Sequence, residues 1–96
     1  MITRRIAICG FGRVGRAFAE LVDQKRAKLA ADYGLELPIT AVVDIGGAAM
    51  DPGGLAVPEL LAHVADGGRV ETFAAAGRAG MTGREVLSAG VADVLV

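Results

Sequence analysis

Residues 6–16, Ile-Ala-Ile-Cys-Gly-Phe-Gly-Arg-Val-Gly-Arg, contain the pattern from which the fold of this chain can be predicted. The apolar run from Arg5 to Cys9 is short and rich in isoleucine, which is typical of a strand buried on both faces of a parallel sheet. Glycines interrupt the run, and from Arg13 onwards the apolar residues recur at helical spacing. A strand, a glycine turn and a helix in this order predict an α/β fold in which helices flank a parallel sheet.

Gly10, Gly12 and Gly15 have the G-x-G-x-x-G spacing that holds the pyrophosphate of a dinucleotide in Rossmann-like domains. Gly10 permits a tight turn, Gly12 keeps the backbone open to the phosphates, and Gly15 removes bulk where the helix crosses the strand. Glycine is common in this chain, at 14 of 96 residues, so the spacing also fits an ordinary strand–helix turn without a ligand.

The start of the predicted helix supplies further candidate binding groups. We expect the backbone N–H groups from Phe11 to Val14 to donate to the phosphates, helped by the partial positive charge of the helix start. The Arg13 side chain has two open placements, along the phosphates or adenine, or in solvent at the start of the helix.

The first helix is predicted to be long and to end at Gly34, a natural C-terminal cap. It is expected to extend past the sheet edge. Six apolar residues are spaced to share its buried side: Val14, Phe18, Leu21, Val22, Leu29 and Tyr33.

Leu37 to Ile45 is predicted to be the second strand, and it carries Asp44 near its end. An acidic residue at this place in a dinucleotide fold accepts hydrogen bonds from the adenosine ribose and repels a 2′-phosphate, which favours NAD over NADP. The usual spacing from the glycines is about 20 residues, and the long helix accounts for the greater separation from Gly15. The alternative is that Asp44 is an ordinary turn residue.

The middle of the chain predicts less regular structure. A loop is expected from Gly46 to Val57, followed by a short helix that begins at Pro58. His63, the only histidine, is predicted to lie on the surface of that helix without a catalytic or metal-binding partner. A short edge strand is expected from Arg69 to Phe73, and a loop or a weak helical turn from Ala74 to Met81.

The last residues predict a short helix and a final strand. Thr82 and Glu85 have the spacing of a capping box, so a helix is expected to follow and to end at Gly90. Val91 to Val96 is typical of a buried strand, yet no later residues could cover it. We therefore expect that a second copy of the chain covers it, or that these residues are the front part of a longer protein. Its unpaired edge predicts self-association.

Composition limits the function classes. A net charge of −1 gives no general attraction to nucleic acid or to an anionic membrane, and no apolar run approaches the length of a membrane span. A single cysteine, Cys9, excludes an internal disulfide and suits a reducing compartment. We expect one cytoplasmic domain over residues 1–96, without a metal site.

Taken together, these motifs resemble the NAD(P)-binding domain of homoserine dehydrogenases. The resemblance rests on the Gly-Phe-Gly-x-Val-Gly-Arg stretch at residues 10–16 and on Asp44 with the Gly/Ala-rich turn after it. It also rests on the Asp-Pro-x-Gly-Leu segment at 51–55, on Leu60-Leu61, and on Ala-Asp-Val-Leu-Val at 92–96. It covers nearly the whole chain.

The resemblance implies an oxidoreductase that interconverts homoserine and aspartate semialdehyde with NAD(P), in the biosynthesis of threonine and methionine. The family's catalytic lysine and aspartate, its amino-acid substrate site and its dimer contact belong to a later domain. Lys25 and Lys28 lie on the first helix and do not match that lysine. The 96 residues alone are therefore expected to bind the cofactor but to be inactive, with no catalytic residue of their own.

Two other function classes remain open. One is a non-catalytic module that senses a dinucleotide and regulates a partner, although such modules place the acidic residue nearer the standard spacing. The other is a structural domain that has lost binding, which the intact glycines and Asp44 disfavour.

Overall fold

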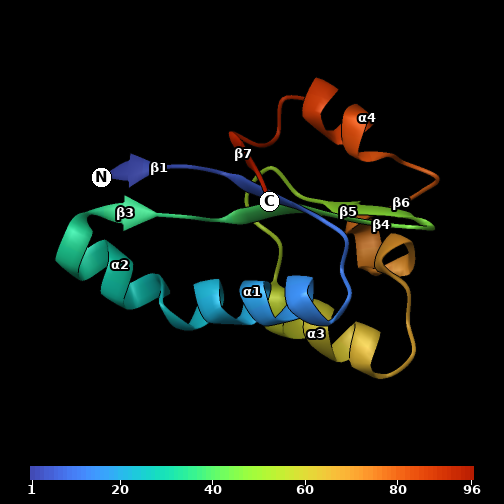
Figure 1. The fold of residues 1–96 in the computed structure, drawn as a ribbon, viewed down its shortest axis with the longest axis horizontal. Coiled ribbons are helices and arrows are strands. Elements are labelled where there is room, and N and C mark those ends of the chain that lie inside the picture. The colour runs from blue at the N-terminus through green and yellow to red at the C-terminus, as the bar shows by residue number, and fades with distance from the viewer.

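In the computed structural model, which describes residues 1–96, a five-stranded sheet runs through the middle of the molecule (Figure 1). Its strand order is β6-β5-β4-β2-β7, and β5 alone runs opposite to the other four. The strands are β2 (Ile6–Cys9), β4 (Ile39–Asp44), β5 (Gly47–Met50), β6 (Gly77–Ala79) and β7 (Val94–Leu95). The predicted α/β fold is confirmed, and its sheet is mixed rather than wholly parallel.

The antiparallel strand β5 corrects the loop expected after Gly46. Asp44 pairs with Gly47, so only Ile45 and Gly46 form the turn of a β4–β5 hairpin. Gly and Ala have low β propensity, which is why the sequence predicts a loop here. Pairing on both edges, with β4 and with β6, overrides that propensity and leaves Ala48 and Ala49 completely buried. The turn expected at residues 51–54 is present, because Gly53 N donates to Asp51 Oδ1 at 2.9 Å.

Helices cover both faces of the sheet unequally. α1 (Arg13–Gln24), α2 (Arg26–Tyr33) and α3 (Val57–Ala65) lie on one face, and the short α4 (Gly83–Ser88) lies on the other (Figure 1). The predicted long helix is thus present as two, which meet at Lys25. Backbone hydrogen bonds continue across Lys25, so α1 and α2 form a nearly continuous rod. The rod ends at Gly34, which has φ 60° as expected of a left-handed cap.

Three of the six residues predicted for the buried side of this rod are exposed: Val14, Leu21 and Tyr33. Gly15, Ala19 and Val22 face the core, with Ala19 and Val22 buried, because the close approach at Gly15 fixes the rotation of α1. Val14 and Leu21 lie on the neighbouring stripe and are 83% and 52% exposed. α2 extends beyond the five-stranded sheet and contacts a separate parallel pair, β1 (Ile2–Thr3) and β3 (Leu35–Glu36). Tyr33 therefore remains exposed.

Residues 69–81 also differ from expectation. Val70–Thr72 is a 3-10 turn rather than an edge strand, because Phe73 N and Thr72 N bond back to Val70 O and Arg69 O. A second 3-10 turn, Ala74–Ala76, leads into β6, which replaces the expected loop. The capping box at Thr82 and Glu85 is confirmed by both of its hydrogen bonds.

Polar contacts from β4 and from Arg5 hold the last segment against the sheet. Thr40 is fully buried and donates through Oγ1 to Val91 O at 2.7 Å. Arg5 forms an ion pair with Asp93 at 3.0 Å, and β7 pairs with β2. The predicted final strand is shortened to the two-residue edge strand β7, whose Val94 and Leu95 are 42% and 47% exposed, as expected of a strand that nothing else in these residues covers. None of the helices has the length and apolar character needed to span a membrane.

Candidate functional site

The glycine turn between β2 and α1 has the backbone geometry that its spacing predicts. Gly10 adopts φ 93°, in the left-handed region, and its N–H donates to Val43 O at 2.7 Å. A Cβ atom on Gly15 would collide with the carbonyl oxygen of Gly10 and lie 3.4 Å from Ile8 Cγ2. Gly15 is therefore required for α1 to start so close to the turn.

Unpaired backbone donors line the mouth of this turn. The first hydrogen bond of α1 runs from Arg16 N to Gly12 O at 3.0 Å, and the N–H groups of residues 11–15 donate to no group in the chain. No side chain caps the helix, and its first turn carries no acidic residue. A Cβ on Gly12 would meet nothing within 4 Å, so the space beside the turn at Gly12 is open. This is an arrangement suited to an anion such as a pyrophosphate.

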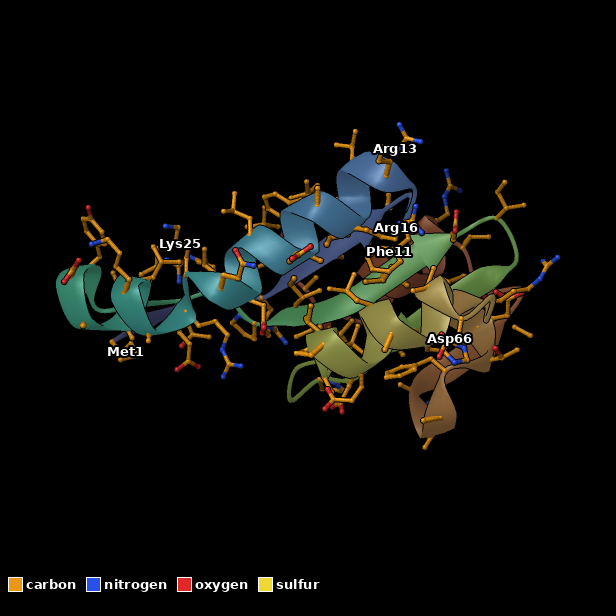
Figure 2. The ribbon with its side chains drawn as sticks, turned by 90° about the horizontal axis from the view of Figure 1, so that it is seen from below. Met1, Phe11, Arg13, Arg16, Lys25 and Asp66 are labelled. Atoms are coloured by element: carbon orange, nitrogen blue, oxygen red, sulfur yellow. The ribbon has the colours of Figure 1, made fainter.

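The three side chains predicted within the turn lie in different environments. Phe11 is 2% exposed and belongs to the core, where Figure 2 shows it beneath α1, towards α3. Only its backbone can therefore contact a ligand. Arg13 and Val14 are exposed, and Arg13 points away from the body of the molecule in Figure 2. Arg16 stays beside the turn, with Nε 3.3 Å from Gly12 O.

Asp44 lies at the same edge of the sheet as the glycine turn. The parallel register pairs Cys9 with Val43, so the carboxyl ends of β2 and β4 are adjacent. Asp44 is exposed, and its carboxylate makes no hydrogen bond or ion pair within the chain. It is free to accept hydrogen bonds from a ligand bound at this edge.

Asp44 lines a cavity of about 350 Å³ whose other walls were not predicted as site residues. The hairpin tip contributes Ile45 and Gly46, the end of α3 contributes Val64, and the segment after α3 contributes the remaining four: Gly68, Arg69, Val70 and Glu71. The glycine pair at 67–68 was the only sequence signal for this tight connection. Nothing local to Arg69 or Glu71 indicates that they line a cavity with Asp44.

His63 fixes the position of this connecting segment. Its Nε2 lies 2.8 Å from Arg69 O and 3.0 Å from Thr72 Oγ1, and its ring packs at 5.5 Å from that of Phe73. A carbonyl oxygen only accepts, so Nε2 carries the hydrogen that bonds Arg69 O. His63 is thus a half-buried structural residue, with no acidic partner.

Another cavity, of about 570 Å³, lies between the α1–α2 rod, β3 and the turn at Gly53 and Gly54. It lies at the opposite end of the sheet from Asp44, beside the amino end of β4. It contains none of the predicted site residues. No group of three or more His, Cys, Asp or Glu side chains is placed to hold a metal ion.

Comparison with known proteins gives two kinds of match. The family model described as Glutamate/Leucine/Phenylalanine/Valine dehydrogenase matches residues 1–96. Among solved structures, the chain is similar to a hyperthermophilic archaeal homoserine dehydrogenase mutant in complex with NADPH, with 22% identity and a TM-score of 0.81. It is also similar to a homoserine dehydrogenase from Thermoplasma acidophilum (22%, TM-score 0.74) and to a putative one from Archaeoglobus fulgidus (28%, TM-score 0.71).

These structural matches cover 96–98% of this chain but only 26–28% of each homoserine dehydrogenase. The chain therefore spans about a quarter of the length of those enzymes. At such identity the likeness shows a shared fold, in agreement with the predicted dinucleotide-binding domain. No curated protein matches the sequence.

Proposed function

Because the chain belongs to the Glutamate/Leucine/Phenylalanine/Valine dehydrogenase family, we propose that it is the NAD(P)-binding part of an oxidoreductase. The single observation that carries this proposal is the open turn at Gly12, where the N–H groups of residues 11–15 have no partner. Similar folds hold NADPH in the archaeal homoserine dehydrogenase. The nicotinamide would supply the hydride chemistry, and this chain would bind and orient the cofactor.

In this proposal each residue at the sheet edge has a separate task. The unpaired backbone N–H groups of residues 11–15 bind the pyrophosphate, while Gly10 and Gly15 give the turn its shape. Asp44 accepts hydrogen bonds from the adenosine ribose and favours NAD over NADP. Arg13 stays in solvent and Phe11 anchors the turn in the core.

The structural matches and the family model favour different substrates. The structural matches favour the reaction of homoserine dehydrogenases, between homoserine and aspartate semialdehyde. With this substrate we propose a role in threonine and methionine biosynthesis, in the cytoplasm. The family model favours an amino acid such as glutamate, leucine, phenylalanine or valine. Assays with NAD(P) and each of these five amino acids, on a protein in which residues 1–96 are joined to a substrate domain, would separate the two. For residues 1–96 alone we expect binding without turnover, because the resemblance to homoserine dehydrogenases implies that the substrate and catalytic groups belong to a later domain.

Substitution of Gly12 by Ala tests cofactor binding without disturbing the fold. The Cβ would meet no protein atom, but it would occupy the space in front of the free N–H groups. We expect NADH binding, measured by isothermal titration calorimetry, to weaken at least about tenfold. Gly53→Ala is the matched control, since its Cβ meets only Asp51 Oδ1, at 3.4 Å, and it should leave NADH binding unchanged. If Gly12→Ala binds as tightly as the unmodified chain, the pyrophosphate does not lie at this turn.

The second candidate is a dinucleotide-sensing regulatory module, which shares the binding site but not the chemistry. NADH binding without activity on any of these amino acids, in a protein that contains the rest of the fold, would favour it. The exposed β7 edge also leads us to propose self-association, and a stable monomer in sedimentation would contradict that.

A further inference from the structure

We propose that Glu71 is a second determinant of cofactor selectivity, which acts with Asp44 to exclude the 2′-phosphate of NADP(H). This inference rests on the proposed function, since it concerns the cavity beside the proposed ribose-binding carboxylate. It assigns a role to a residue that comes from a distant segment of the chain.

Glu71 is held against the tip of the β4–β5 hairpin. Its side chain is 13% exposed, and a Cβ on Gly46 would lie 2.7 Å from Glu71 Cδ, so the carboxyl group packs directly on the turn that follows Asp44. Asp44 and Glu71 line the same cavity of about 350 Å³. Two acidic residues therefore line the same small cavity.

Arg69 is the only cation that lines this cavity. Its Nη1 lies 3.8 Å from Glu71 Oε2, which is an ion pair but too long for a hydrogen bond, and its side chain is 74% exposed. His63 holds the backbone of Arg69 through its carbonyl oxygen, and from this backbone the side chain reaches Glu71. Two carboxylates and one guanidinium leave the cavity with a net negative charge.

The charge balance determines which ribose this cavity accepts. Ribose hydroxyls can donate hydrogen bonds to carboxylates. A 2′-phosphate brings a charge of about −1.5 to −2, which two acidic residues in the lining of one cavity would repel. Neutralising Glu71 removes one of these charges and releases Arg69, whose guanidinium can bind phosphate in a bidentate manner. Glu71 thus acts both directly and by restraining Arg69.

The test compares ADP-ribose with ADP-ribose 2′-phosphate, because these probes need no nicotinamide site. Dissociation constants for both are measured by isothermal titration calorimetry on the full chain and its variants. For Glu71→Gln we expect the affinity ratio to shift towards the 2′-phosphate by about fivefold or more, with ADP-ribose affinity unchanged within about twofold. Asp44→Ser, the reference variant, should shift the ratio further. Glu59→Gln makes the same chemical change on α3 outside the cavity and should not shift it.

A double variant separates the two ways in which Glu71 acts. If Glu71 restrains Arg69, Glu71→Gln combined with Arg69→Gln should lose most of the gain in 2′-phosphate affinity. Arg69→Gln alone, at an exposed position that should tolerate the change, should weaken 2′-phosphate binding about twofold to threefold and leave ADP-ribose binding unchanged. This single variant keeps the inference testable even where Glu71→Gln fails to fold, as judged by circular dichroism.

The outcomes distinguish this inference from the proposed function. If the unmodified chain binds ADP-ribose but the ratio is the same in Glu71→Gln and Glu59→Gln, the role of Glu71 is overturned and cofactor binding stands. If Glu71→Gln does not fold and Arg69→Gln leaves both affinities unchanged, the role is likewise overturned. If the unmodified chain binds neither compound, the proposed function fails, and this inference fails with it.

Discussion

The two faces of the sheet are packed in different ways. The face under α1 and α3 buries a cluster of 12 apolar residues that includes Ile8, Phe11 and Leu60. The face under α4 buries a cluster of six, in which small residues such as Ala7 predominate and Val86 comes from α4 itself. The larger cluster is therefore the main core, and the smaller one needs only a six-residue helix to cover it.

This difference shows which face supports the candidate site. Phe11 ties the glycine turn to the larger cluster, and Leu60 packs α3, whose far end carries the segment with Arg69. The α4 face instead holds Val91, at the start of the last segment. Weakening the first face should therefore disturb both stability and cofactor binding, whereas weakening the second should change stability alone.

The largest expected effect comes from shortening one buried side chain on each face of the sheet and comparing the two losses of stability. Leu60 is 1% exposed and Val86 is fully buried. Leu60→Ala should lower the free energy of unfolding by about 2–5 kcal/mol, since a cavity remains in the larger core. Val86→Ala removes one side-chain carbon fewer and should cost about 1.5–3 kcal/mol. Urea denaturation of both variants measures the two losses.

The second measurement is NADH binding by both variants, without denaturant. The folded fraction of Val86→Ala should bind like the unmodified chain, because α4 does not line the proposed site. The folded fraction of Leu60→Ala should bind more weakly, since α3 loses its main contact with the core. Equal losses of binding in both variants would show that the site does not depend on one face.

Removing the capping box of α4 should cause a smaller loss of stability, confined to the face of the sheet that α4 covers. Thr82 Oγ1 accepts a hydrogen bond from Glu85 N at 3.2 Å, and Glu85 Oε1 accepts one from Thr82 N at 3.0 Å. Thr82→Ala should lower the free energy of unfolding by about 1 kcal/mol, because the N–H group of Glu85 loses the hydroxyl oxygen that accepts its hydrogen bond. Thr82→Ser keeps the hydroxyl and is the matched control in the same denaturation experiment. A loss as large as that of Leu60→Ala would contradict the minor role of α4.

The sequence predicted those elements whose structure depends on interactions between residues close together in the chain. The strand before Gly10, the turn and the helix after it follow from β-branched content, glycine spacing and helical periodicity. The position of Asp44 at the strand end and the capping box at Thr82 were predicted for the same reason. In each case, the interacting groups lie within a few residues of one another.

Tertiary contacts determined the elements that were missed. β5 and β6 consist of Gly, Ala, Met and Arg residues with little β preference, and only their pairing makes them strands. The sequence gives no sign that Glu71 packs on Gly46, because that contact arises from the fold of α3 and the turn after it. The exposure of Val14 depends likewise on the rotation of α1 that Gly15 permits.

The smallest effect concerns the ion pair that fastens the last segment to the sheet. Hydrogen bonds from the Arg5 side chain and backbone N–H lower the pKa of Asp93 from 3.8 to about 2. A carboxyl whose pKa is lower in the folded state stabilises the fold above its unfolded pKa, and this contribution is lost as the pH falls. The stabilisation should be complete above about pH 5 and should disappear between about pH 4 and 2.

Asp93→Asn isolates this contribution. The unmodified chain should be more stable than the variant at neutral pH, and the two free energies of unfolding should converge as the pH falls towards 2, when Asp93 is protonated in both states. Because the pair is partly exposed, added salt should also reduce the difference. A difference that stays constant from pH 7 to pH 2 would mean that the Asp93 charge does not hold the segment. Equal stability of the two proteins at every pH would instead mean that the hydrogen bond from Arg5 N, which an asparagine oxygen can also accept, is the main contact.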